Sequence, residues 1–278
     1  MNSPARITAL AVALAGMVLS MSGCNQLAAR DQLNKGVDAY RSAHFEEAIG
    51  HFQRATELDP TLPMAKTYLA TALAQNVVPG LQSPENLRNA QQAINIFQQV
   101  LSQDPTDVNS VKQIAGIYFQ INKLEEAKTW QKKVLAMNPK DAEADYTIGV
   151  IDWMEAHKNV LTALQPAGFN DDGQGNLKVP KKIMEPLAKQ NAALIEEGLQ
   201  YLKDAVANRP TYDDAMTYLN LMYRAKANQD YANPAELKAD LAAAQEWTDK
   251  AMGTRKANEA KKAQAANGGI TMGSGSNQ

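Results

Sequence analysis

The stretch GVDAYRSAHFEEAIGHFQRATELDP, residues 36–60, places apolar and small residues at helical spacing on both sides of a short break. Its closing proline recurs along the chain, as LDP ending at Pro60, QDP at Pro105, MNP at Pro139 and NRP at Pro210. Proline cannot donate the hydrogen bond that continues a helix, and it disfavours helical geometry at the preceding residue. The sequence therefore predicts successive helix pairs, each closed by a proline that turns the chain into the next pair.

Small side chains recur at fixed distances from these prolines and at matching places in the preceding helices. Helices approach to about 8–10 Å only where the facing side chains are small. The positions predicted to pack helices together are Gly36, Ala48, Ala55, Ala70, Ala93, Ala115, Ala127, Gly149, Gly198, Ala205, Ala244 and Ala251, with Asn220 as a departure. Larger residues, namely Phe45, Phe52, Phe97 and Leu202, are expected to fill the space beside these contacts.

This pattern resembles the tetratricopeptide repeat, a 34-residue pair of antiparallel helices. Pro105 and Pro139 are 34 residues apart, and Gly36 and Ala48 keep the same 12-residue interval as Ala115 and Ala127. An unrelated alanine-rich bundle would not be expected to keep this register. The resemblance implies an all-α, right-handed solenoid of about five helix pairs, with repeats near 29–62, 63–107, 108–141, 142–212 and 213–255.

The register also predicts the individual helices and the places where extra sequence is inserted. The expected pairs are 29–42 and 45–58, 63–76 and 86–103, 108–121 and 124–137, 142–157 and 186–208, and 213–227 and 234–255. Repeats 2, 4 and 5 are longer than standard, and in each the excess falls between the two helices; the longest insert covers about 158–185. Insertions in repeat proteins often collect on the binding face, but exposed loops also tolerate neutral insertions. Both interpretations stay open.

Candidate catalytic and metal-binding groups are sparse. His44, His51 and His157 show none of the spacings typical of metal ligands, and the sequence has no nucleophile elbow, phosphate-binding glycine loop or CxxC. Asp171 and Asp172 lie in the glycine-rich GFNDDGQGN, but they are adjacent, whereas an EF-hand needs alternating oxygen ligands. We therefore expect a solvated loop there, and a non-enzymatic protein without cofactor or metal.

The charge content excludes one class of partner. The chain has 28 basic and 30 acidic side chains, a formal net charge of −2, and no basic stripe. Because nucleic-acid binding depends on neutralising phosphates with clustered cations, nucleic acid is not an expected partner. No small-molecule substrate is evident either.

The first 23 residues have the features of a secretory signal: Arg6, then a mostly apolar run over 7–21 that is shorter than the ~20 residues of a transmembrane helix. Met21, Ser22, Gly23 and Cys24 resemble the bacterial lipobox, which implies a signal peptide over 1–23, diacylation of Cys24, and a short tether over 24–28. The alternative is ordinary secretion with a free cysteine, or with cleavage beyond it. The same resemblance, with Asn25 where inner-membrane lipoproteins carry Asp, favours the periplasmic face of the outer membrane, with the inner membrane or the cell surface as alternatives. Residues 256–278 are expected to form a flexible tail.

First helices line the concave surface in the family that the repeats resemble. The register places there Val37, Tyr40, Arg41, Thr71, Lys112, Phe119, Tyr146, Val150, Trp153, Leu221 and Arg224. Lys112 has Gly116 where chaperone-binding members carry asparagine, so a carboxylate clamp is not expected.

The expected function is a lipid-anchored adaptor that binds a protein partner in envelope assembly, pilus biogenesis or secretion, resembling pilotin-type lipoproteins. The alternatives are a self-assembling structural protein, and an enzyme or metal protein that uses the 158–185 insert.

Overall fold

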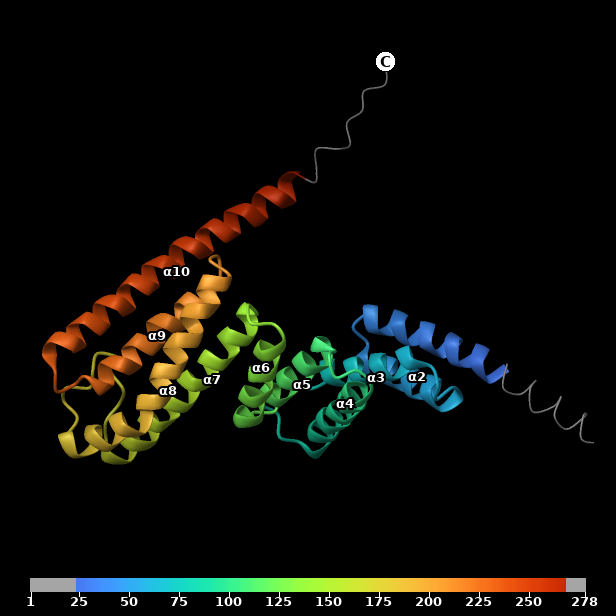
Figure 1. Ribbon diagram of the computed structural model, residues 1–278, viewed down its shortest axis with the longest axis horizontal. Helices are drawn as coiled ribbons and strands as arrows, with labels where there is room; N and C mark the ends of the chain where they lie inside the picture. The colour runs from blue at the N-terminus through green and yellow to red at the C-terminus, as the bar shows by residue number, and fades with distance from the viewer. Residues whose placement is uncertain (1–23, 269–278) are drawn as a thin grey trace, which may run out of the picture. The chain divides into compact units, whose positions relative to one another are not determined.

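The computed structural model describes residues 24–268, and all regular structure in that part of the chain is helical (Figure 1). The all-α class predicted from the sequence is confirmed. In order, the elements are a helix over 24–41, α2 (Phe45–Leu58), α3 (Pro63–Gln75), α4 (Pro84–Gln103), α5 (Val108–Gln120), α6 (Leu124–Met137), α7 (Ala142–Leu164), the 3-10 turn η1 (Gln165–Ala167), α8 (Lys181–Asn208), α9 (Asp213–Gln229) and α10 (Pro234–Gly268). The bounds of α2 to α6 match the prediction to within two residues.

The sequence DPT builds the turn between repeats in two places. Asp59 Oδ1 accepts hydrogen bonds from the amide and the hydroxyl of Thr61, at 3.0 and 2.6 Å. Asp104 Oδ1 makes the same pair of bonds with Thr106, at 2.9 and 2.6 Å. An aspartate that bonds to the backbone two residues ahead stabilises a turn. Pro60 and Pro105 thus sit inside turns that the flanking side chains fix.

The described chain packs as two compact units that divide after Trp130, within α6. In the first unit α2 packs on α3, α3 on α4 and α4 on α5. In the second, α7 packs on α8, α8 on α9, α9 on α10, and α7 also contacts α9. Consecutive helices are therefore the main packing partners in each unit.

Close contact in the first unit occurs where Gly36 meets Phe52. A Cβ atom added to Gly36 would lie 2.5 Å from the Phe52 ring, and Phe52 is only 1% exposed. Ala48, Ala55 and Ala70 are fully buried nearby in the same core. The ring therefore occupies the space that a larger residue at position 36 would need.

Two glycines have the same function in the second unit. A Cβ atom on Gly149 of α7 would collide with Leu202 of α8 and lie 3.1 Å from the Gly198 carbonyl oxygen. A Cβ on Gly198 would collide with Met222 of α9 and lie 3.0 Å from Asp152 Cβ. The expectation that Phe52 and Leu202 fill the space beside small residues is confirmed. The remaining positions predicted for packing are also buried: Ala93, Ala115, Ala127, Ala205, Ala244 and Ala251.

Three segments differ from the expected boundaries. Residues 24–28 are helical, not a free tether. In the insert, α7 continues to Leu164 and α8 starts at Lys181, with Pro186 inside the helix, so the non-helical part is confined to about 168–180. A proline so near a helix start removes only one hydrogen bond, which explains why α8 is not interrupted.

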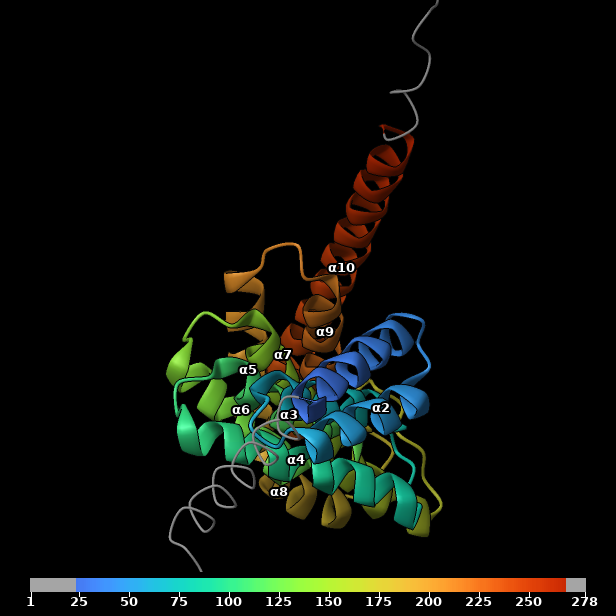
Figure 2. The same cartoon turned by 90° about the vertical axis from the view of Figure 1, so that its right-hand side faces the viewer.

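The third difference is α10, which continues to Gly268 through most of the predicted tail and projects beyond α9 (Figure 2). Residues 254–266, TRKANEAKKAQAA, have high helix propensity and no proline. Arg255 also bridges to Asp213 at 2.7 Å and to Asp214 at 3.3 Å. Loss of the apolar pattern here means that the helix is exposed, not that the helix ends. Residues 1–23 and 269–278, which include the predicted signal peptide and the end of the tail, lie outside the described residues.

No helix within residues 24–268 has the length and apolar character that crossing a bilayer requires.

Replacing Gly149 with alanine tests the packing at α7. We expect a loss of about 1–3 kcal/mol in the free energy of unfolding, because the new methyl group has no room beside Leu202. Gly253 is the matched control, because a Cβ there meets nothing within 4 Å; Gly253→Ala should stabilise α10 by up to about 1 kcal/mol. Urea unfolding measures both, and equal effects of the two changes would refute the packing role.

A buried carboxyl group makes stability depend on pH. Asp145 is 3% exposed and accepts a hydrogen bond from Asn208 at 3.0 Å. Burial raises the pKa of Asp145 to about 6; repulsion from Asp204 and Asp141 adds to this, and the Asn208 bond opposes it. The folded protein therefore holds this proton more tightly than the unfolded chain does. The stabilisation that the bound proton contributes is complete below about pH 4 and is lost as the pH rises through 6.

Asp145→Asn should therefore be more stable than the parent protein at pH 7.5, and this advantage should shrink by about 1 kcal/mol at pH 5. Burial also raises the pKa of Asp240 to about 6. Because Asp240 is present in both proteins, the comparison isolates the effect of Asp145. Denaturation at the two pH values provides the measurement. A difference in stability that does not change with pH would contradict the assignment.

Candidate binding surfaces

A pocket in the first unit lies between the helix over 24–41 and α3. Its volume is about 320 Å³. Its lining residues are Val37, Tyr40 and Arg41 from the first helix, Phe52 from α2, and Thr67, Tyr68 and Thr71 from α3. Four of the predicted groove residues, Val37, Tyr40, Arg41 and Thr71, are therefore brought together in one place.

Aromatic contacts hold the walls of this pocket. The Phe52 and Tyr68 rings stack with centroids 5.6 Å apart, and Tyr40 meets Phe45 edge-on at 5.4 Å. Arg41 is exposed, and no acid in residues 24–268 forms an ion pair with it. The pocket therefore combines an apolar interior with a cation at its rim. These features suit an apolar side chain followed by an acidic group.

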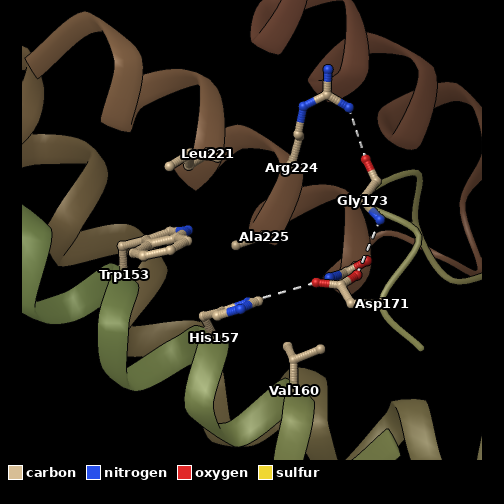
Figure 3. A pocket seen from close by; sticks show the side chains of 9 residues that line it. Trp153, His157, Val160, Asp171, Gly173, Leu221, Arg224 and Ala225 are labelled. Atoms are coloured by element: carbon tan, nitrogen blue, oxygen red, sulfur yellow. Dashed lines mark hydrogen bonds and ion pairs between the residues drawn. The ribbon is translucent and has the colours of Figure 1, made fainter. Parts of the chain in front are cut away.

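A smaller pocket in the second unit has a volume of about 110 Å³ (Figure 3). Its walls are Trp153, His157 and Val160 of α7; Leu221, Arg224, Ala225 and Asn228 of α9; and Asp171 and Gly173 of the insert. Three predicted groove residues, Trp153, Leu221 and Arg224, meet here. The insert supplies two of the remaining walls.

The polar groups around this pocket are held by one another. Trp153 stacks on His157 at 5.0 Å with their planes 7° apart, and His157 Nδ1 lies 3.7 Å from Asp171 Oδ2. Arg224 Nη1 donates to the Gly173 carbonyl at 3.0 Å, and its Nε donates to Asn220 Oδ1 at 3.0 Å. Figure 3 shows Arg224 reaching from α9 to the insert. Arg224 therefore fixes one wall of the pocket, and Asn220, the departure from the small-residue pattern, orients it.

The insert is exposed over much of its length, but it is also anchored, which the sequence did not predict. Asn176 is 1% exposed, and its Nδ2 donates to Asn228 Oδ1 of α9 at 2.9 Å and to Asp171 Oδ1 at 3.0 Å. Its own amide donates to Asp172 Oδ1, while its Oδ1 accepts from the Asp172 amide, each at 2.9 Å. The aspartates thus fix the loop, and residues 24–268 contain no group of three or more His, Cys, Asp or Glu side chains arranged to hold a metal.

The other predicted groove residues have different surroundings. Val150 is 5% exposed and belongs to the interior, so its placement in an open groove was wrong. Tyr146 packs against Tyr212 and Tyr218 at 4.9 and 5.6 Å, and burial raises its pKa. Lys112 and Phe119 are half-buried on α5 and do not line the first-unit pocket.

The residues that sequence reasoning missed are those that the insert brings in. Gly168, Gly173, Gly175 and Asn176 all have positive φ angles, between 53° and 94°. Such angles favour glycine and asparagine, so the glycine-rich GFNDDGQGN signalled a defined turn. Its partner Asn228 is 52 residues further along the chain, and no local pattern indicates it.

Comparison with known proteins agrees with this architecture. The tetratricopeptide repeat family model matches residues 87–148. Three solved structures share the fold: "MamA RS-1 ArsTM double mutant" (18% identity, TM-score 0.54, covering 84% of this chain and 97% of that one), "MamA 41-end from Desulfovibrio magneticus RS-1" (19%, 0.53, 83% and 96%) and "Crystal structure of MamA protein" (13%, 0.51, 82% and 92%). Residues 87–148 are therefore assigned to the tetratricopeptide repeat family. The predicted solenoid class is confirmed, and at these identities the likeness concerns the fold alone. No curated protein sequence matches the chain.

Asn176→Ala tests the anchoring of the insert. Removing the amide leaves Asn228 without this partner and places alanine at a φ of 53°, so we expect the free energy of unfolding to fall by about 2–3 kcal/mol. Backbone amides of residues 169–179 should exchange hydrogen faster. Gln174→Ala, at an exposed position in the same loop, is the control. Unchanged exchange in the Asn176 variant would show that the insert is held by other contacts.

Proposed function

We propose that this protein is a non-enzymatic adaptor that binds an extended segment of a partner protein. The observation that carries the proposal is the first-unit pocket between successive first helices. Its apolar interior is formed by Tyr40, Phe52 and Tyr68, and Arg41 lies at its rim. Rigid aromatic side chains are common anchors for binding because they bury a large area at low entropic cost.

The volumes and lining groups of the first-unit pocket and the second-unit pocket favour a peptide over a small-molecule substrate. Pockets for drug-sized ligands have volumes of about 300–1,000 Å³, so 320 Å³ is near the lower limit and 110 Å³ is below it. Spaces of this size suit individual side chains. In neither pocket does a nucleophile lie beside a base in the arrangement that covalent catalysis requires.

The charge at the first-unit pocket limits which residues the partner segment can carry there. Arg41 is the only charged residue among those that line this pocket. We propose that the partner segment places an apolar residue, preferably aromatic or branched, over Phe52 and Tyr68, with an aspartate or glutamate next to it. Arg41 would pair with this acid in a charge-assisted hydrogen bond.

The location that best accords with the sequence is the bacterial envelope, with the protein anchored by lipid at Cys24. Cys24 is the only cysteine in the chain, and it is exposed and free at the start of the first described helix. An acyl group there would not disturb the packing of either unit. The outer membrane and a role in envelope assembly, pilus biogenesis or secretion are parts of the proposal that rest on the lipobox resemblance.

Filling the pocket from α3 tests peptide binding. Peptides selected from a displayed library on the parent protein should lose at least about tenfold in affinity for Thr71→Arg, because the new side chain occupies the pocket and repels cations. Fluorescence anisotropy with labelled peptides measures the dissociation constants. Gln98→Arg, an exposed position on α4 with the same charge change, should leave affinity within about twofold.

Two results would contradict this proposal. One is that the selected peptides bind Thr71→Arg as tightly as the parent protein. The other is that they lack the predicted apolar and acidic neighbours, which would place binding elsewhere on the chain.

Cys24→Ser tests the anchor. In bacterial cells the parent protein should be recovered with membranes, and intact mass should show a diacylglyceryl group on Cys24, whereas the variant should lack this mass. Gln26→Ser keeps the cysteine and should be acylated normally. An unmodified Cys24 in the processed parent protein would rule out lipid attachment there.

A further inference from the structure

The insert displays a leucine at its surface between two buried residues. Leu177 is 64% exposed, while Asn176 on one side is 1% exposed and Val179 on the other is 7% exposed. We name residues 177–182, Leu-Lys-Val-Pro-Lys-Lys, the insert turn. A large apolar side chain that stays exposed forfeits the free energy it would gain on burial, so the outward position of Leu177 needs a physical reason.

The surrounding bonds hold this leucine outward. The Val179 amide donates to the Asn176 carbonyl at 2.9 Å, and Asn176 is itself tied to Asn228 of α9. A Cβ atom on Gly175 would collide with Leu237 of α10 and lie 3.3 Å from the Ala227 carbonyl oxygen, so the backbone just before the turn is pressed against the helices. Leu177 is therefore presented by a fixed turn.

Three lysines follow this leucine within five residues of sequence. Lys178, Lys181 and Lys182 are exposed, and within residues 24–268 none of the three forms an ion pair. The acids in the neighbourhood have other partners: Glu185 pairs with Lys189 at 3.4 Å, and Asp171 and Asp172 accept hydrogen bonds inside the loop. In a chain with a net charge of −2, the insert turn is therefore a local concentration of positive charge with an apolar tip.

We propose that the insert turn contacts the surface of an anionic lipid bilayer, with Leu177 entering the interface and the three lysines facing the headgroups. An exposed apolar side chain flanked by flexible cations suits such an interface, because lysine stems lie along apolar material while their ammonium groups reach the headgroups. Each lysine near an anionic membrane contributes about a fivefold gain in partitioning. Three lysines together give a gain on the order of 100-fold.

A bilayer accounts for this patch better than an acidic protein does. Recognition of individual carboxylates favours arginine, whose planar guanidinium binds two oxygens at once, and the insert turn has none. Lysine acts as a point charge that responds to the diffuse field of a charged surface. This contact goes beyond the proposed adaptor function and does not depend on acylation of Cys24.

A local probe in the full-length chain tests the proposal. Leu177→Cys in a Cys24→Ser background provides one thiol for an environment-sensitive NBD fluorophore. Vesicles of phosphatidylcholine with 30% phosphatidylglycerol are compared with vesicles of phosphatidylcholine alone. Because the readout is local, attachment of the chain through its N-terminal segment does not mimic the result. The same fluorophore at Gln98→Cys, an exposed position on α4, is the control for the label site.

We expect the emission from position 177 to shift to shorter wavelength on the anionic vesicles only, and to be quenched by a nitroxide on the lipid chains. The triple change Lys178→Glu, Lys181→Glu and Lys182→Glu should abolish the shift. Lys256→Glu, Lys261→Glu and Lys262→Glu, at exposed positions of α10, change the charge equally and should preserve it. Circular dichroism checks that each variant is folded, and the corresponding Lys→Gln triple replaces any variant that is not.

No shift on anionic vesicles, an equal shift on both vesicle types, or a shift that survives the insert-turn charge reversal would overturn the proposal. A response to soluble polyglutamate without one to anionic vesicles would also overturn it, and would identify the insert turn as a docking site for an acidic protein.

Discussion

Close approach of helices at glycine and alanine is the constraint on which this structure depends. Leu202 packs against Gly149, Met222 against Gly198 and Phe52 against Gly36. None of the three glycines has room for a Cβ atom. Because these contacts join consecutive helices, they set how each helix lies on the next. A chain with few aromatic residues, 6% of the total, thereby obtains a dense core from small residues that let larger ones interlock.

The same contacts build the candidate binding surfaces. Phe52 both fills the space over Gly36 and lines the first-unit pocket, so the packing that holds the repeat together also positions the pocket's aromatic residues. In the second unit, α7 and α9 are brought together and the insert closes the remaining side through Arg224 and Asn228. Binding features therefore arise where helix faces meet and where inserted sequence is fixed onto them.

Most of the fold could be predicted from local patterns. Proline spacing and small-residue spacing predicted the bounds of helices α2 to α6 to within two residues, since both signals act within one repeat. The insert could not be predicted in the same way, because its conformation depends on bonds from Asn176 and Gly173 to residues 52 and 51 positions away. Val150 was misplaced for a related reason: helical register says which residues share a face, but not how deeply that face is buried.

Compensation between Gly149 and Leu202 tests the central claim most directly. Leu202→Ala removes the atoms that a methyl group at position 149 would strike. The free energies of unfolding of Gly149→Ala, Leu202→Ala and the double variant form a double-mutant cycle. We predict that the double variant loses less free energy of unfolding than the two single variants lose together, by about 1 kcal/mol or more. Strict additivity would show that the missing side chain at position 149 does not set the packing of α7 on α8.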